Sequence, residues 1–567
     1  MKNLAFLFFV VSMVLGVPAG LSAAPVARPT PEQLAWQDME LEMFVCMDPC
    51  EWQGREYDNH STPLAQINPV KLDAEQWCRA ARSFGAGQIL FVAKHTGGFC
   101  WWHTETSKYG IKETPYKSGR GDVLAEVAAA CRKHGLKLAV YVYPGDDQWG
   151  ASMGRGGKTK DPAKQDAYNR VFRQQMTEVL SNYGPISEVW FDGSCVIEVG
   201  DILRKHAPQA MVFQGPHATL RWVGNEAGYA PYPAWNSVRK ADAGTGIATA
   251  AHGTPDGDVW MPLEVDTVLH DHFWFWKADN ARSRRSLEKL MDCYYRSVGH
   301  GAVLLLNSAP ATDGLIPEGD MTLYDVFGKE IQRRFDKSIA ESRGEGTAVE
   351  LDLGRPTPVN HVISMEDIAQ GERVRAYRLE GLVGTQWKVL YGEGISIGHK
   401  KIDRFPTETL SRVRLVVTRS AETPIIRRLA AYHVDIGPNS PMGSVQDAPA
   451  GRWTRLTALE AGALRGEWKT WTIDLTPGIR APGEFEFEVC GTGGEGRLEV
   501  RQVELLIAGQ VIEDRVKPVA GSPGRFHIYR MEQTTADSPS IARVTARWVG
   551  PKPGPGEARI RPRPQSQ

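Results

Sequence analysis

The sequence lacks the features that would point to nucleic acid, nucleotide or membrane binding. Its 66 basic and 67 acidic residues give a net charge of −1, and no block of like charges occurs, so neither nucleic acid nor an anionic membrane surface is a favoured partner. No GxGxxG or P-loop motif stands at a predicted strand–helix junction, so we expect no nucleotide and no other cofactor. Beyond the N-terminus, no segment offers the run of about 18 apolar residues that a membrane-spanning helix requires.

Cysteine is scarce, with eight residues in a chain of 567, at positions 46, 50, 78, 100, 131, 195, 293 and 490. Their spacing assigns no disulfide pairing. Cys46 and Cys50 are only weakly similar to a metal-binding or redox pair, because no second CxxC or CxxxC partner accompanies them. We therefore interpret them as buried or loop thiols.

The first residues, MKNLAFLFFVVSMVLGVPAGLSAAPVARP, have the pattern of a secretory signal peptide. Lys2 supplies the positive charge, residues 4–17 form the apolar segment, and Ser22, Ala23 and Ala24 suit a cleavage site. We place cleavage after Ala23, so residues 1–23 are a predicted signal peptide. The protein is therefore expected in the periplasm, on the cell surface or in the medium, without membrane insertion after cleavage.

A length of 567 residues is too great for one ordinary domain. Over residues 30–340, apolar runs of four to six residues alternate with amphipathic helical segments, which is typical of a parallel sheet covered by helices. The fold class that this predicts is α/β, a (β/α)8-like TIM barrel. An open doubly wound sheet is the alternative.

After residue 345 the pattern changes to short alternating strands separated by turn residues, which indicates β-sandwiches. We predict one sandwich at 345–436, a Pro/Gly/Ser-rich linker at 437–451, a second sandwich at 452–550 and a disordered tail at 551–567. A sandwich can bind glycan through exposed aromatic side chains, and the first one offers Tyr377, Trp387 and Tyr391. Aromatics in strands are usually core residues, however.

Carboxyl and other polar side chains follow the predicted strands of the barrel, at the end where such barrels hold their active sites. They are Asp48, Lys94, His95, Asp146, Asp147, Asp192, Glu226, Glu264 and Asp266. Tryptophans cluster among them. Aromatic rings pack on sugars and carboxyl pairs cleave glycosidic bonds, so this combination favours carbohydrate chemistry. His270 and His272 have H-x-H spacing, but no third ligand is identifiable and we expect no metal.

Several segments, in order, resemble the α-L-fucosidases of glycoside hydrolase family 29, in the branch with narrower substrate range. They are QLAWQDMELEMFV, KHTGGFCWW, NYGPISEVWFDGS, RWVGNEAGYAP, GDVW with MPLEVD, SLEKLMDCYYRSVGHGAVLLLN and ATDGLIPEGD. The resemblance runs from about residue 32 to 338. The first sandwich resembles the discoidin-like, galactose-binding-like domains that often follow this catalytic domain.

This resemblance implies that Asp192 is the catalytic nucleophile and Glu226 the acid/base of a retaining mechanism, in which the two carboxyl groups lie about 5–5.5 Å apart. The predicted substrate is a terminal sugar of an oligosaccharide or polysaccharide. The side chains that we expect to bind it are His95, Trp102, Glu56, Tyr57, Asp146, Trp190, Trp222 and Trp274.

The sequence departs from the family where sugar hydroxyls are held. Cys46, Met47 and Asp48 stand where the family has a His-aromatic-Gly segment, and the family's HHDGF is here residues 95–99, His-Thr-Gly-Gly-Phe. An unpaired buried polar group costs about 1–3 kcal/mol, so these changes predict an altered sugar: fucosyl, α-L-galactosyl or a substituted relative. A catalytically weak or inactive glycan-binding protein on the same barrel is the alternative. The oligomeric state is not readable.

Overall fold

The computed structural model describes residues 26–243 and 252–435 and, beyond these, residues 454–459, 467–475, 483–491, 495–507, 510–513, 520–522, 526–533, 540–552 and 556–562. The predicted signal peptide and the predicted linker lie outside the described residues. In the part of the chain that is described, no helix combines the length and apolarity that crossing a bilayer requires.

Eight parallel strands form the barrel, in the order β5-β4-β3-β2-β1-β10-β9-β6. Their bounds are β1 Leu41–Val45, β2 Gln88–Lys94, β3 Lys137–Val142, β4 Ile186–Trp190, β5 Met211–Phe213, β6 Arg221–Trp222, β9 Leu263–Thr267 and β10 Val303–Ser308. A parallel bridge from Phe213 to Leu220, the residue before β6, brings the two ends of the sheet together. The predicted barrel is therefore confirmed, and the open sheet was the wrong alternative.

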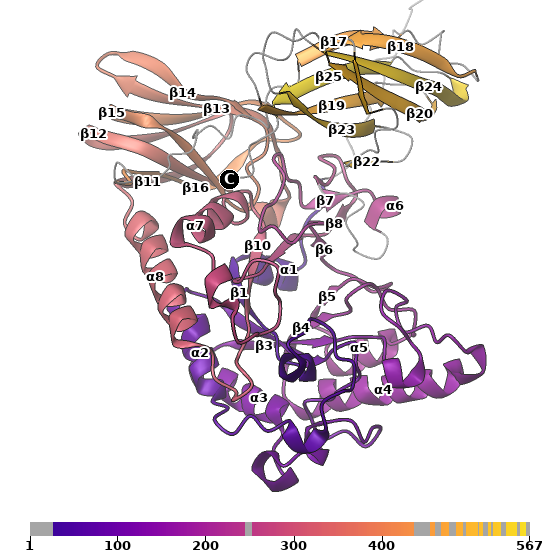
Figure 1. Cartoon of the computed structure of the whole chain (residues 1–567). Helices are drawn as coiled ribbons and strands as arrows, with labels where there is room; N and C mark the ends of the chain where they lie inside the picture. Colours follow the sequence, from indigo (N-terminus) through magenta and orange to yellow (C-terminus); the bar gives the residue numbers. More distant parts are fainter. Residues whose placement is uncertain are drawn as a thin grey trace, which may run out of the picture.

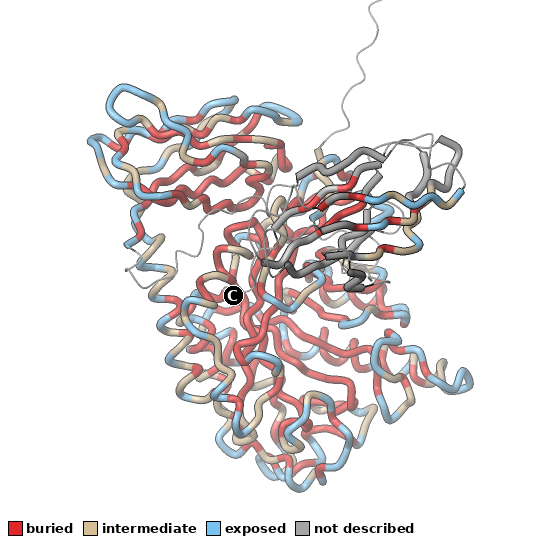
Figure 2. Tube along the Cα trace, turned by 45° about the horizontal axis from the view of Figure 1, so that its top comes forward, coloured by how far each residue is buried: buried red, intermediate tan, exposed pale blue. Residues whose placement is uncertain are grey.

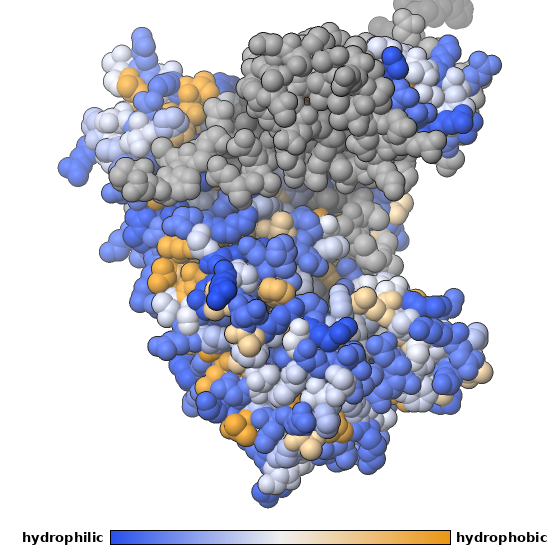
Figure 3. Space-filling view, in the orientation of Figure 1, coloured by the Kyte–Doolittle hydropathy of each residue, from blue (hydrophilic) through white to orange (hydrophobic). Residues whose placement is uncertain are grey.

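Helices cover the outside of the barrel, as Figure 1 shows for its indigo to magenta part. They are α1 Pro31–Gln37, α2 Ala74–Ser83, α3 Val123–His134, α4 Gln165–Asn182, α5 Gly200–His206, α7 Leu287–Arg296 and α8 Glu318–Phe335. The short helix α6 Lys240–Ala243, which has no buried residue, follows the first strand of a two-stranded ribbon, β7 Ser237–Val238 and β8 Val259–Trp260. The barrel strands form a continuous buried core in Figure 2. The face seen in Figure 3 is mainly hydrophilic over the barrel, with small scattered apolar patches, as expected for helices with one wet side.

The first all-β domain is a six-stranded antiparallel sheet, in the order β11-β16-β12-β15-β13-β14. The strands are β11 Ala340–Glu345, β12 Ala348–Glu366, β13 Val374–Val383, β14 Gln386–Gly394, β15 Lys401–Ser420 and β16 Ile425–Tyr432. Register shifts between Asp352 and Thr357 interrupt the long β12–β15 pair. Such irregularities let strands bend, and residues from both halves of β12 share one core.

The first sandwich is joined to the barrel by a shared core. Ile363, Ile402 and Tyr432 belong to the same apolar cluster as the barrel–helix residues. Glu372 lies in this interface, where its carboxylate accepts hydrogen bonds from the backbone N–H of Asn236 (2.9 Å) and from its side-chain amide (2.6 Å). The barrel and this domain are therefore packed as neighbours rather than only linked.

Two sheets form the second sandwich: β17-β25-β19-β23-β22 and β18-β24-β20-β21. The strands are β17 Thr454–Leu459, β18 Lys469–Asp474, β19 Gly483–Gly491, β20 Glu495–Ile507, β21 Gln510–Glu513, β22 Ala520–Ser522, β23 Phe526–Gln533, β24 Ser540–Lys552 and β25 Gly556–Pro562. Phe487 and Ile560 from one sheet share a core with Val503 and Val544 from the other. The two predicted β-sandwiches are thus confirmed.

Two expectations about the β domains need correction. The tail at 551–567 is not disordered throughout, because β25 pairs with both β17 and β19. Its buried Ala558 and Ile560 alternate with charged residues, which is the period of a strand, although the many prolines around it favour disorder. In the first sandwich, Tyr377 and Tyr391 are buried core residues, so of the three aromatics only Trp387 remains as a surface candidate.

Candidate active site

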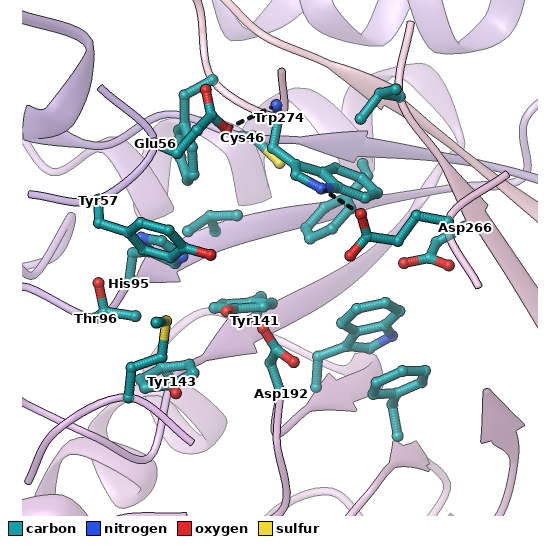
Figure 4. Close-up of a pocket in the computed structure, with 18 of the residues that line it drawn as sticks. Cys46, Glu56, Tyr57, His95, Thr96, Tyr141, Tyr143, Asp192, Asp266 and Trp274 are labelled. Atoms are coloured by element: carbon teal, nitrogen blue, oxygen red, sulfur yellow. Dashed lines mark hydrogen bonds between the residues drawn. The ribbon is translucent and has the colours of Figure 1, made fainter. Parts of the chain in front are cut away.

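A cavity of about 480 Å³ opens at the carboxyl ends of the barrel strands, where barrel enzymes place their catalytic groups. Five carboxyl side chains line it, and the charges of three of them, Asp192, Glu226 and Asp266, act on one another. The other lining residues are Phe44, Cys46, Glu56, Tyr57, Val92, His95, Thr96, Tyr141, Tyr143, Met153, Trp190, Phe213, Gln214, Trp222, Val268, Asp271, His272, Trp274, Phe275 and Arg285. The cavity therefore combines acids with an aromatic wall (Figure 4).

Asp192 stands two residues beyond the end of β4, at a sharp turn. Gly193 and Ser194 both have positive φ, 72° and 82°, conformations in which glycine is favoured and serine is strained. The side-chain oxygen of Gln214, next to β5, accepts hydrogen bonds from the backbone N–H groups of Gly193 (2.7 Å) and Ser194 (3.2 Å). Gln214 thereby holds the turn that presents the Asp192 carboxyl to the cavity.

The Asp192 carboxyl group faces the open cavity but has protein on its other sides. Tyr141, on β3, donates a hydrogen bond from its hydroxyl to Asp192 Oδ2 (2.9 Å), and the two groups point toward each other in Figure 4. Burial raises the pKa of Asp192, the Tyr141 hydrogen bond lowers it, and the charge of Glu226 raises it. The Tyr141 bond therefore favours the carboxylate form, the form that a nucleophile requires.

Glu226 lies in the loop after β6, with its carboxyl in the cavity. The indole N–H of Trp274 donates to Glu226 Oε2 (3.2 Å). The Thr267 hydroxyl, at the end of β9, donates to the Glu226 backbone carbonyl (2.9 Å). Two different loops and a strand end thus position this acid, and its side chain remains exposed to solvent within the cavity.

Asp266, on β9, is the third of the interacting carboxyl groups in the cavity. Its side chain is almost fully buried, and Trp222 donates its indole N–H to Asp266 Oδ1 (2.7 Å). Burial raises the pKa of Asp266 to about 8, the Trp222 bond lowers it, and the negative charges of Glu226 and Asp192 raise it further. At neutral pH the group is therefore protonated and adds no negative charge beside Asp192 and Glu226.

One wall of the cavity is formed by stacked rings around His95, at the end of β2. Tyr57 stacks on the imidazole with a centroid distance of 5.8 Å and an interplanar angle of 11°, and Phe275 approaches to 4.8 Å. Burial lowers the pKa of His95 to about 3, so the ring is neutral. A neutral imidazole among aromatic rings can hydrogen-bond a sugar hydroxyl as donor or acceptor without adding charge.

Glu56 and Trp274 support one another beside Tyr57. Glu56 Oε2 accepts a hydrogen bond from the backbone N–H of Trp274 (2.9 Å), and Lys277 lies 3.2 Å from Glu56 Oε1. The ring of Trp190 forms part of the cavity floor and stacks on Phe213 at a centroid distance of 3.6 Å. Six of the eight side chains predicted to bind sugar therefore line the cavity: His95, Glu56, Tyr57, Trp190, Trp222 and Trp274.

Two of the predicted sugar-binding residues do not reach the cavity. Trp102 is fully buried in the packing around the barrel, where its indole N–H donates to Glu178 of α4 (2.9 Å). Asp146 is buried against Lys94, at 3.7 Å, and the Gly98 backbone packs so closely on it that an added Cβ would lie 2.6 Å from the carboxyl group. Both residues follow strands, but their side chains turn outward from the barrel axis.

The remaining polar candidates do not come together at one point. His270 and His272 do not converge: His270 hydrogen-bonds Asn280 (2.8 Å) and Asp320 (3.0 Å), while His272 lines the cavity. Asp48 and Glu264 are fully buried and do not line the cavity. Cys46 lines it and Cys50 does not, and both are buried free thiols.

Sequence reasoning missed Tyr141, Gln214 and Arg285 as cavity residues. For Tyr141 a signal existed, because in the strand around it every second residue must face the barrel axis. Gln214 follows an apolar run, and nothing in the sequence distinguishes it from other loop residues as one that lines the cavity. Arg285 reaches the cavity from far along the chain, where it pairs with Asp271 (2.8 Å).

Replacing Tyr141 with Phe removes the hydrogen bond to Asp192 and leaves the ring. A hydrogen bond to a charged group contributes about 1.5–3 kcal/mol, so kcat/KM should fall by about 10- to 100-fold and the acid limb of the pH–rate profile should move to higher pH. Tyr143→Phe is the matched control, since the Tyr143 hydroxyl accepts from the Gly154 backbone instead (2.9 Å). Equal losses in the two variants would contradict the role of Tyr141.

Asp266→Asn should change how stability depends on pH. The pKa of Asp266 in the folded protein, about 8, exceeds the value of about 3.9 in an unfolded chain. The proton on Asp266 therefore makes its full contribution to the free energy of unfolding below about pH 4. This contribution decreases as the pH rises and is lost at about pH 8. Asn lacks this titration. Urea unfolding should show the wild type losing up to about 1 kcal/mol per pH unit relative to Asp266→Asn between pH 5 and 8; a constant difference would contradict the burial of a protonated acid.

Comparisons with known proteins agree with the geometry. The sequence profile of the α-L-fucosidase family matches residues 31–333. The chain is 30% identical over 462 residues to a protein of Oryza sativa subsp. japonica that is named as an α-L-fucosidase, covering 71% of this chain and 86% of that one. A glycoside hydrolase 29 family member from an unknown rumen bacterium superposes with a TM-score of 0.67 at 27% identity, over 95% of this chain and 100% of that chain.

A second solved structure carries a sugar. It is a Ruminococcus gnavus GH29 fucosidase in complex with fucose, with a TM-score of 0.63 and 25% identity, over 73% of this chain and 97% of that chain.

Proposed function

Because the chain belongs to the α-L-fucosidase family of glycosidases, we propose that it is an exported, exo-acting, retaining enzyme that releases a terminal α-L-fucosyl or closely related residue from a glycan. The observation that carries this proposal is the meeting of Asp192 and Glu226 in one aromatic-walled cavity at the carboxyl end of the barrel. The fucose complex of a structural relative supports the sugar class.

The reaction proceeds by double displacement. Asp192 attacks the anomeric carbon, while Glu226, protonated, donates its proton to the leaving glycosidic oxygen. Water then enters, Glu226 removes its proton, and the water oxygen displaces Asp192, so that the configuration is retained. The hydrogen bond from Tyr141 to Asp192 favours the ionised form of the nucleophile, and the neutral Asp266 adds no negative charge beside it.

The shape of the cavity supports action at a glycan end. Phe44, Trp190 and Phe213 line its floor. Trp190 stacks on Phe213, and Phe44 packs against Trp190 at a tilt of 53°, with the ring centroids 5.2 Å apart. A sugar at the end of a chain can enter such a closed cavity, whereas an internal residue would need an exit on the far side.

The identity of the sugar depends on Cys46 and Thr96, which replace polar residues of the family and line the cavity. A thiol is a weak hydrogen-bond donor, so the sugar loses a strong partner near Cys46. We propose that the enzyme accepts fucose or a sugar that differs at the hydroxyl near Cys46, such as an α-L-galactosyl or a substituted residue.

The proposal that the enzyme is exported rests on the signal-peptide pattern of residues 1–23.

Activity assays with aryl α-L-fucoside and aryl α-L-galactoside test the proposal. The wild type should release the aryl group from at least one of them, and Asp192→Ala should lower kcat by about 1,000-fold or more. Glu226→Ala should spare substrates with activated leaving groups and lose the others, and added azide should restore its turnover. Asp147→Ala, an exposed acid outside the cavity, is the control and should stay active.

Two results would overturn the assignment. Turnover unaffected by Asp192→Ala would remove Asp192 as the nucleophile. Absence of release from both aryl glycosides and from a panel of α-linked glycans, with glycan binding intact, would favour the alternative of an inactive glycan-binding protein, which the altered residues Cys46 and Thr96 motivate.

A further inference from the structure

A second group of carboxyl side chains lies inside the barrel, beneath the floor of the cavity. Glu42 projects from β1, Glu188 from β4 and Glu264 from β9, and none has any exposed surface. One carboxylate oxygen from each lies within 4.8 Å of the other two. Three acids from three separate strands therefore meet at one point that water does not reach.

The hydrogen bonds around this group are unevenly shared. Glu188 accepts from the indole N–H groups of Trp36 (2.8 Å) and Trp190 (2.8 Å) and from the side-chain amide of Gln88 (2.7 Å). Among the described residues, no donor meets hydrogen-bonding distance and angle at either oxygen of Glu42 or of Glu264. Their nearest polar neighbours are the Gln88 amide and the carboxyl groups of the cluster itself. Four fully buried carboxyl oxygens thus face one another without a donor, although such groups are almost always satisfied in folded proteins.

Charge makes this arrangement costly unless something neutralises it. Burial and the negative charge of Glu188 raise the pKa of both Glu42 and Glu264, and the opposing effect on Glu42 comes from Gln88, Lys137 and Glu264. Lys137 begins β3 and is itself exposed, so it does not close an ion pair inside the barrel. Buried carboxylates are found paired with cations or bound to metal ions.

We propose that Glu42, Glu188 and Glu264 bind one divalent cation of the class that prefers oxygen ligands, with Ca²⁺ as the first candidate. Three carboxylates can supply up to six oxygens, and Ca²⁺ takes six to eight at about 2.3–2.6 Å. Oxygens that share such an ion lie up to about 5 Å apart, which the 4.8 Å limit satisfies. Mg²⁺ fits less well, because it retains several waters and this point is closed to solvent.

The cation is structural rather than catalytic. Glu188 on β4 lies four residues before Asp192, which follows the strand, and Glu264 lies two residues before Asp266 on β9. The ion therefore ties together the strands that carry two of the cavity acids, and through Glu188 it fixes the indole of Trp190 in the cavity floor. Hydrolysis itself needs no metal.

The test measures metal content and melting temperature on the full-length protein. Purified enzyme dialysed against metal-free buffer should retain close to one equivalent of Ca²⁺ by plasma mass spectrometry. Prolonged EDTA treatment should remove the ion and lower the Tm, and added CaCl2 should raise the Tm with the logarithm of its concentration. Mg²⁺ and Mn²⁺ are titrated in parallel.

Glu42→Gln and Glu264→Gln keep the side-chain shape and should each weaken Ca²⁺ binding by about tenfold or more, with loss of the EDTA-dependent Tm shift. Glu318→Gln, an exposed acid on α8, is the control and should behave as the wild type. Folding of each variant is checked by circular dichroism.

The competing arrangement is a set of carboxyl groups that share protons. It would show no bound metal in the wild type, no effect of EDTA, and a Tm at neutral pH that the Gln variants leave unchanged or raise; this outcome would overturn the proposal.

Discussion

Repulsion among carboxyl groups in the barrel interior is the constraint on which the rest of the site depends. Alternate residues of a strand face the same side, so β4 directs Glu188 and Trp190 inward and leads to Asp192 at the turn that follows it, and β9 directs Glu264 and Asp266 inward. Since the strands are parallel and end together, these acids form two levels, one at the cavity and one beneath it. Each level requires its own means of limiting negative charge.

At the cavity, each acid has different neighbours, and these neighbours favour different protonation states. A phenol hydroxyl favours the ionised form of Asp192, solvent and an indole N–H surround Glu226, and burial keeps a proton on Asp266. Acids whose environments separate their pKa values can take separate roles in acid–base catalysis. The same indoles that donate to Glu226 and Asp266 also form the apolar wall against which a sugar ring packs.

Most of the fold could be predicted from the sequence, because buried parallel strands and amphipathic helices have distinct periods. The two proposed catalytic acids and six of the residues expected to bind sugar could be placed in the cavity, because they lie at strand ends or in the loops that follow them. Trp102 and Asp146 could not, since a residue after a strand can turn toward the axis or toward the covering helices, and packing against Glu178 and Lys94 decides between them. The strand β25 could not be predicted for a similar reason. Its proline-rich surroundings favour disorder, but burial of Ala558 and Ile560 in the sandwich core stabilises it as a strand.

The central claim, that Asp192 forms a covalent bond with the sugar, is tested most directly by trapping the glycosyl-enzyme. A 2-deoxy-2-fluoro-α-L-fucosyl or galactosyl donor with a good leaving group slows the second step more than the first, because the fluorine destabilises the positively charged transition state. Peptide mass spectrometry after proteolysis should then find one sugar attached to the peptide that contains Asp192. A sugar attached to the peptide of Glu226 or of Asp266, or slow turnover with no labelled peptide, would contradict the account.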